Sequence, residues 1–96
     1  MSYIIVIPAR YQSSRLPGKP LINLCGIPMI VRTYNQCIKF APAEKVYVAT
    51  DNIQIQDVCE LNGIRVVMTS NNCLTGTDRV AEVAKQIKVQ TYINVQ

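Results

Sequence analysis

The residues best suited to chemistry are the cations of one short segment, PARYQSSRLPGKP, at positions 8–20. It carries Arg10, Arg15 and Lys19 directly after the apolar run YIIVI. Arginine side chains match phosphate oxygens in two-point contacts and lysine adds a compact positive charge, so the three together suit a polyphosphate. Three prolines restrict the backbone, while Gly18 permits a tight turn. A stiff loop of this kind loses little entropy when it binds a ligand.

A plain surface loop with solvated charges would have the same composition, so these residues alone leave both interpretations open. Other phosphate and catalytic motifs are excluded. A Walker A loop needs glycine where Ser13 stands and serine or threonine where Pro20 stands. The G-x-G-x-x-G fingerprint is absent, and a chain without histidine has no Ser-His-Asp triad.

The charge balance favours a small anionic partner. The 96 residues form at most one domain, 1–96, with a formal net charge of +4. Its lysines and arginines form neither a block nor a stripe interleaved with aromatic residues, so a nucleic acid partner is not expected. No run approaches the roughly 18 apolar residues of a membrane span, and the N-terminus does not resemble a secretory leader.

The cysteines predict a reducing compartment. They are far apart, with no C-x-x-C pair and no histidine to complete a common zinc site. Free thiols and a cytoplasmic location follow from this pattern. Cys73 stands in a polar loop and is the one candidate for a reactive thiol, whereas the others, Cys25, Cys37 and Cys59, suit a core.

Apolar patterning predicts strands and helices in regular alternation. Runs rich in β-branched residues predict strands at 3–7, 45–50, 64–69 and 91–96. Apolar residues at helical spacing predict helices between them, from Pro28 to residue 41, from Asp51 or Asn52 to Gly63, and from Thr75 or Thr77 onward. The β-α-β-α-β-α-β order predicts a Rossmann-like, three-layer α/β/α fold with a mostly parallel sheet.

In such sheets ligands bind beyond the carboxyl ends of the strands. This rule places the first loop, residues 49–51, the loop at 69–77 and Gln96 along one rim. The last strand has no following element in the sequence, so we expect the fold to be incomplete at its C-terminus. An uncovered strand would leave apolar surface exposed and favour association.

Several single residues have an ordinary structural role as an alternative to a functional one. Asp51 is expected to cap a helix rather than to act as a rim carboxylate. Asp78 fits the first turn of a helix, where the dipole favours a negative charge, and Arg79 faces either solvent or ligand. Met29, Met68 and Tyr34 are expected in the core.

The motifs, taken in order, resemble the 3-deoxy-manno-octulosonate (Kdo) cytidylyltransferases, the CMP-Kdo synthetases. The matching segments are IPARYQSSRLPGKPL at 7–21, G-x-P-M-I at 26–30, VATDN at 48–52, TGTDRVAEV at 75–83 and INVQ at 93–96. Acylneuraminate cytidylyltransferases share this plan, but Tyr11 and Leu16 follow the Kdo type.

The resemblance implies transfer of a cytidylyl group from CTP to Kdo, with release of pyrophosphate, for lipopolysaccharide biosynthesis. It also implies Mg²⁺ as cofactor and a homodimer. By position, Arg10 and Lys19 match the family's catalytic nucleotide-phosphate residues, and Ser13 and Arg15 are plausible helpers. The other residues carried over are Pro8, Ala9 and Thr69 for the nucleotide base, Gln96 for nucleotide and sugar, and, more weakly, Arg79 for the sugar.

The family pattern continues past NVQ into G-D-E-P, whose aspartate helps hold Mg²⁺. That motif and the later sugar and metal residues are absent from these 96 residues. We therefore expect no metal ligands within this chain and no transferase activity from it alone. Two alternatives stay open: a non-catalytic CTP-binding fragment, and a related synthetase for another acidic sugar.

Overall fold

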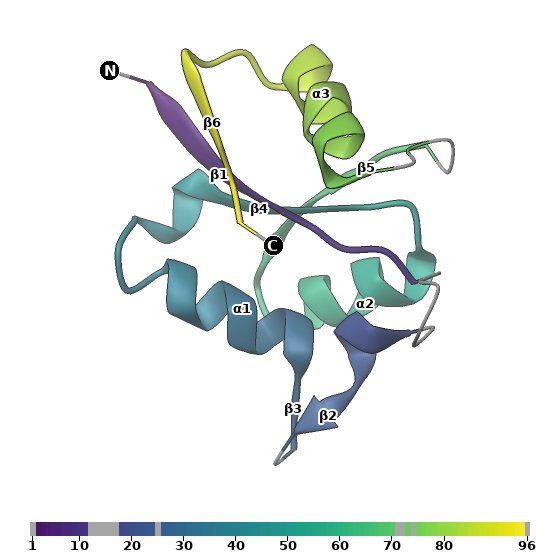
Figure 1. The fold of residues 1–96 in the computed structure, drawn as a ribbon. Coiled ribbons are helices and arrows are strands. Elements are labelled where there is room, and N and C mark those ends of the chain that lie inside the picture. Colours follow the sequence, from purple (N-terminus) through teal and green to yellow (C-terminus); the bar gives the residue numbers. More distant parts are fainter. Residues whose placement is uncertain (1, 12–17, 25, 71–72, 74, 96) are drawn as a thin grey trace.

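The computed structural model describes most of the chain, and its layers are shown in Figure 1. The described residues are 2–11, 18–24, 26–70, 73 and 75–95. Across them, strands and helices alternate as expected, and the helices cover both faces of a parallel sheet. The predicted α/β class with a parallel sheet is confirmed.

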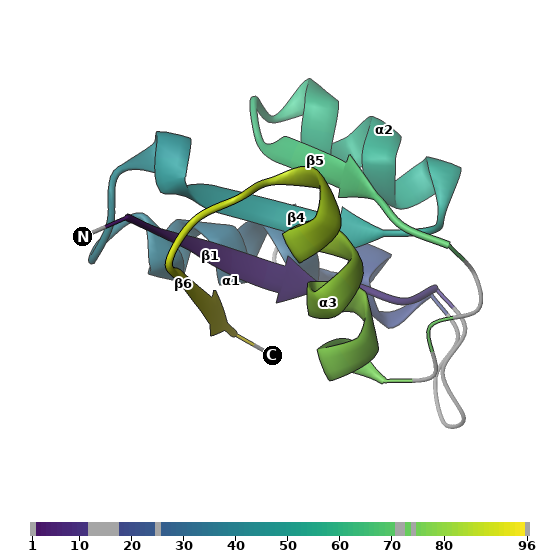
Figure 2. The same cartoon turned by 90° about the horizontal axis from the view of Figure 1, so that it is seen from above.

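The main sheet has the strand order β5-β4-β1-β6, with every neighbouring pair parallel. Its strands are β1 (Tyr3–Pro8), β4 (Val46–Thr50), β5 (Arg65–Met68) and β6 (Thr91–Asn94). Figure 2 shows the four side by side in this order. The chain moves outward from β1 through β4 to β5, then returns to the other side of β1 as β6. The order therefore reverses between β1 and β6.

β1 is central because its side chains are apolar on both faces. The four residues from Ile4 to Ile7 are all buried, which is the pattern of a strand covered on both sides. Ile5 pairs with Val46 of β4 on one side and with Ile93 of β6 on the other.

The helices form the two outer layers. α1 (Met29–Cys37) and α2 (Ile53–Leu61) lie on one face of the sheet, and α3 (Gly76–Gln86) lies on the other (Figure 1). This division follows from the strand order: right-handed crossovers place helices on opposite faces when the direction of strand addition reverses. The three-layer arrangement is thus confirmed.

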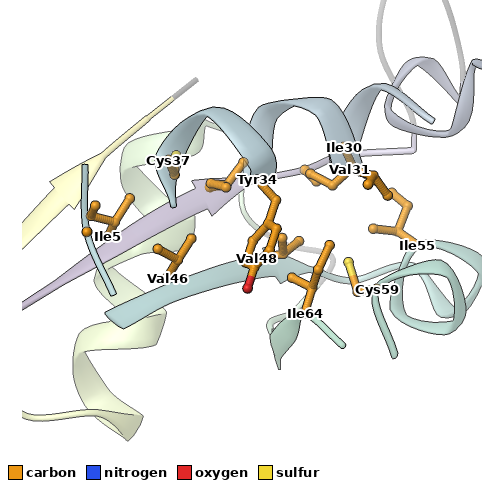
Figure 3. Close-up of a cluster of buried hydrophobic side chains, with 13 residues drawn as sticks. Ile5, Ile30, Val31, Tyr34, Cys37, Val46, Val48, Ile55, Cys59 and Ile64 are labelled. Atoms are coloured by element: carbon orange, nitrogen blue, oxygen red, sulfur yellow. The ribbon is translucent and has the colours of Figure 1, made fainter. Parts of the chain in front are cut away.

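The larger core cluster lies under α1 and α2. Figure 3 shows Tyr34 extending from α1 across this cluster toward Val48 and Ile64. On the α3 face a smaller cluster is built around Val6 and Val83, both fully buried. Tyr34 is buried as expected, whereas Met29 and Met68 are only half-buried.

Caps define where two helices begin. The side chain of Asn52 accepts a hydrogen bond from the Ile55 N–H at 3.0 Å, so Asn52 is the N-cap of α2. The expectation that Asp51 caps this helix is wrong. Thr75 caps α3 and forms a reciprocal capping box with Asp78, in which each side chain accepts a hydrogen bond from the other residue's backbone N–H.

Other helix ends are close to the predictions. Gly63 follows α2 with φ +69°, the left-handed conformation that glycine adopts without strain. Pro28 lies just before the first residue of α1 instead of being that residue, and α1 ends at Cys37, short of Ala41. Ile38, which directly follows α1, is 40% exposed.

Short elements were missed from the sequence. They are the 3₁₀ turns η1 (Lys19–Leu21) and η2 (Ala43–Lys45) and a small antiparallel hairpin of β2 (Asn23–Leu24) and β3 (Ile27–Pro28). Elements of two or three residues are too short to show a hydrophobic period.

The sheet edge at β6 exposes apolar surface, as predicted. Ile93 is 42% exposed and Phe40 is 85% exposed. Both residues line a groove of about 590 Å³, together with Tyr3, Ile5 and Cys37 among others. Association through this surface stays a prediction.

Candidate functional site

The carboxyl ends of the strands form one continuous rim. Beyond β1, the Ala9 N–H donates to the Ala49 carbonyl at 2.9 Å, and beyond β5, the Thr69 N–H donates to the Thr50 carbonyl at 2.8 Å. These bonds extend the sheet pairing past the strand ends. The segments that follow β1, β4 and β5 therefore begin side by side, which confirms the rim predicted from the sequence.

The fourth segment joins the rim at the point where the strand order reverses. Beyond β6, the Val95 N–H donates to the Val6 carbonyl at 3.0 Å. In open α/β sheets, ligands bind at this kind of reversal. The segments after β1 and β6 are therefore the two best placed to meet a ligand.

The segment after β1 begins with a buried residue and then turns outward. Ala9 is 3% exposed, whereas the next residue, Arg10, is exposed. The loop closes where the Gly18 N–H donates to the Tyr11 carbonyl at 2.6 Å. Gly18 has φ +76°, and a Cβ there would lie 3.2 Å from the Tyr11 ring. Both observations favour glycine at this position.

Closure of the loop brings Lys19 back to the body of the protein. Lys19 is the first residue of η1, and this turn packs against both α1 and α2. The side chain of Lys19 lies outside the described part of the chain, as do Ser13, Arg15 and Gln96. Their assignments stay predictions.

Arg79 of α3 is turned into the protein, so the solvent-facing alternative is wrong. The residue is 1% exposed. Its Nη1 donates to Thr69 Oγ1 at 2.6 Å and to the Ser70 carbonyl at 3.5 Å, and it lies 3.8 Å from Asp51 Oδ1. Its Nε is buried and has no hydrogen-bond partner among the described residues. Arg79 thus contacts the ends of β4 and β5 together.

Asp51 has a role that the helix-cap expectation missed. A buried guanidinium is costly unless an opposite charge or hydrogen-bond acceptors surround it. Asp51 supplies the negative charge opposite Arg79, and its own side chain is 25% exposed. The carboxylate therefore neutralises an internal cation at the rim.

Glu82, one helical turn beyond Arg79, was not singled out from the sequence. Its carboxylate accepts hydrogen bonds from the Ser70 N–H at 2.8 Å, the Ser70 hydroxyl at 2.5 Å and the Cys73 thiol at 2.9 Å. The bonds from Cys73 and Ser70 lower the pKa of Glu82 from 4.5 to about 2. The spacing of Arg79 and Glu82 was the available signal, because residues three apart lie on one helix face.

The environment of Cys73 contradicts the interpretation as a reactive thiol. Cys73 is 6% exposed. Burial, and then its hydrogen bond to Glu82, raise the pKa of the thiol, and the protonated form is a poor nucleophile. Burial likewise raises the pKa of Cys37, and it raises that of Cys59 to about 11. Cys37 and Cys59 are core residues, as expected.

The described residues lack both a membrane-spanning helix and a group of metal ligands. None of their helices is long and apolar enough to cross a membrane. Within the same part of the chain, no three side chains of His, Cys, Asp or Glu are grouped so that they could hold a metal ion.

The chain is similar in sequence to known cytidylyltransferases. The family model described as "Cytidylyltransferase" matches residues 4–96. The 3-deoxy-manno-octulosonate cytidylyltransferase of Escherichia coli is 44% identical over 93 residues, which cover 97% of this chain and 38% of that protein. The protein of the same name from Chlorobium phaeobacteroides is 49% identical, over 100% of this chain and 39% of its own length.

Solved structures agree with the sequence comparisons. A CMP:2-keto-3-deoxy-manno-octonic acid synthetase complexed with CTP superposes with a TM-score of 0.94 at 43% identity, covering 100% of this chain and 40% of that one. A cytidylyltransferase from Leptospira borgpetersenii superposes with a TM-score of 0.71 at 29% identity, covering 98% and 41%. The chain thus spans about two fifths of the length of these relatives. Because the family model spans nearly all of its residues, the chain belongs to the cytidylyltransferase family.

Proposed function

We propose that this chain is the nucleotide-binding part of an enzyme that transfers a cytidylyl group from CTP to Kdo, releasing pyrophosphate and forming CMP-Kdo. The observation that carries the proposal is the basic segment that leaves β1 at the reversal of strand order. The names of the relatives support the nucleotide and the sugar. The pathway to lipopolysaccharide, a homodimer and a cytoplasmic location belong to the same proposal.

The residues of the first segment suit this chemistry. Attack of a sugar hydroxyl on the α-phosphorus requires alignment of the two groups and neutralisation of the charge on the phosphate oxygens. Arg10 is exposed just beyond β1, the strand next to the reversal of strand order. The hydrogen bond between Gly18 and Tyr11 brings Lys19 back close to the end of this strand. We assign both residues to the phosphates, with help from Ser13 and Arg15.

The neighbouring rim segments suit the base and the sugar. The main chain of Pro8 and Ala9 ends β1 beside the reversal point, where a flat base could lie against it. Thr69 lies two strands away, beyond β5, and Gln96 follows β6. We assign Pro8, Ala9 and Thr69 to the nucleotide and Gln96 to both substrates.

Mg²⁺ is proposed for the complete enzyme only. When bound, the ion would neutralise phosphate charge. The described residues do not fit such a site: of the carboxylates at the rim, Asp51 faces Arg79 and Glu82 accepts bonds from Ser70 and Cys73. Hard cations need several free oxygen ligands. No step is therefore assigned to a metal held by these residues.

Titration of CTP, UTP and ATP into the protein tests the proposal. We expect CTP to bind more tightly than the other two nucleotides. Lys19→Ala should leave the free energy of unfolding within about 1 kcal/mol of the parent, because a side chain that serves to bind phosphate contributes little to folding. In the complete enzyme it should reduce turnover by orders of magnitude. A fully active Lys19→Ala enzyme would refute the assignment.

A non-catalytic CTP-binding module is the second candidate. The part of these relatives that the chain matches, about two fifths of their length, includes the basic segment after β1. Such a module would bind CTP selectively without consuming it. Release of pyrophosphate from CTP and Kdo separates the two functions.

A further inference from the structure

α3 presents a row of polar side chains to the end of β5. Arg79, Glu82 and Gln86 stand at positions i, i+3 and i+7 and so share one face of the helix. All three contact the same short stretch of chain. Gln86 Nε2 donates to the Met68 carbonyl at 3.2 Å, and the other two reach Thr69 and Ser70. This face of α3 therefore follows the backbone as it leaves the sheet.

Arg79 ties three segments together. Its guanidinium contacts Thr69 and Ser70 beyond β5 and Asp51 beyond β4, while its backbone belongs to α3. A nearly fully buried arginine with an unsatisfied Nε is a poor source of stability, since removing the charge from water costs more than partial pairing returns. Its clearest effect is to set the position of the Thr69 hydroxyl.

Glu82 acts on the next part of the same segment. One carboxylate accepts three hydrogen bonds, two from Ser70 and one from Cys73. Ser70 is exposed, so water could satisfy its N–H and its hydroxyl without any help from the protein. These bonds therefore take the place of bonds to water. Their main effect is to favour one conformation of the segment.

We propose that Arg79 and Glu82 are positioning residues, which hold the segment at Thr69, Ser70 and Cys73 ready for the nucleotide. The inference rests on the proposed function, because the segment matters for binding only if the rim holds CTP. A segment already ordered before binding loses less entropy when the ligand arrives. Arg79 and Glu82 thus act through Thr69 and Ser70, without touching the nucleotide.

The test compares CTP affinity in Glu82→Ala, Glu82→Gln and Arg79→Lys, measured by calorimetry on the full chain well below its melting temperature. We expect Glu82→Ala and Arg79→Lys to raise the Kd for CTP by about tenfold. Glu82→Gln keeps one acceptor oxygen and should raise it by less. A purely structural role would lower the melting temperature without moving the Kd of the folded protein.

Matched controls use the same changes at exposed positions far from the rim. Glu60→Gln on α2 and Arg65→Lys at the start of β5 should leave the Kd unchanged. A Kd within twofold of the parent in both Glu82→Ala and Arg79→Lys would overturn the inference.

A second measurement separates this inference from the proposed function. Hydrogen exchange of the Ser70 amide, which donates to Glu82, should accelerate in Glu82→Ala. A parent protein that fails to bind CTP would refute the proposed function. The positioning inference would then be decided by exchange, and an unchanged Ser70 amide would overturn it.

Discussion

Arg10 and Arg79 lie near the same rim in opposite surroundings. Arg10 is exposed where the chain leaves β1, whereas Arg79 is 1% exposed beneath the ends of β4 and β5. Both match family motifs, and both were candidates for ligand binding from the sequence. The difference teaches that a cation near the rim can either stay accessible at the surface or connect the segments of the rim from inside.

The elements that carry the two arginines explain the difference. Arg10 lies between the end of β1 and Tyr11, whose carbonyl accepts the hydrogen bond from the Gly18 N–H. Arg79 lies in the second turn of a capped helix, on the side that faces the sheet, and Asp51 supplies a nearby negative charge. Because this side of α3 packs against the sheet, the side chain of Arg79 is held in the interior.

The largest effect on folding is expected from Arg79→Ala. Loss of this large buried side chain leaves a cavity and unpaired groups on Thr69 and Asp51, so the free energy of unfolding should fall by about 3 kcal/mol. Urea unfolding measures it. A loss below about 0.5 kcal/mol would show that the buried contacts contribute nothing to stability.

Arg10→Ala should give the opposite result. The exposed side chain contributes little to folding, so the free energy of unfolding should change by less than about 0.5 kcal/mol. Loss of a charged hydrogen bond to phosphate should weaken CTP binding by about 2 kcal/mol. Calorimetry measures the CTP affinity, and urea unfolding of the same preparation measures the stability. Unchanged CTP affinity would contradict the assignment of Arg10 to the phosphates and would remove its functional contrast with Arg79.

Asp51→Asn should have a smaller effect than Arg79→Ala. It leaves the buried guanidinium without its nearby negative charge but keeps the size of the side chain, so we expect a loss of about 1–2 kcal/mol in urea unfolding. Asp57→Asn on the exposed side of α2 is the matched control and should be neutral. Equal effects of the two changes would contradict the pairing with Arg79.

The smallest effect on the free energy of unfolding is expected when the pH is lowered. The folded protein lowers the pKa of Glu82 from 4.5 to about 2, so its carboxylate stabilises the fold at pH values above about 4.5. This contribution should be lost as the pH falls from 4.5 toward 2. Urea unfolding across that window should therefore show a shallower acid loss in Glu82→Gln than in the parent. The same slope in both would show that Glu82 is not held by Ser70 and Cys73.

Much of the fold could be predicted because its signals are local. The apolar run at 3–7 identified a strand, Gly63 marked the end of a helix, and Thr75 was one of two proposed caps. Each depends on neighbours within a few positions. The turn η1 and the β2–β3 hairpin could not be predicted, because they are too short to show a hydrophobic period.

The candidate site was predicted less completely. The rim followed from the strand alternation, and Arg10 was found there, but Ser13, Arg15, the Lys19 side chain and Gln96 lie outside the described residues. The polar neighbours of Cys73 in the sequence predict an accessible, reactive thiol. In space it meets Glu82, nine residues later, which keeps its proton in place.

The order of residues by itself determined the layered α/β plan, the basic loop after β1 and the rim to which it belongs. Hydrophobic period, proline and glycine act over a few positions and so can be identified without coordinates. Only the tertiary structure decided that Arg79 is internal, that Asp51 is its counter-charge and that Glu82 holds Ser70 and Cys73. These roles depend on how α3 packs across the sheet, because burial and pairing of a charge are set by segments distant in the chain.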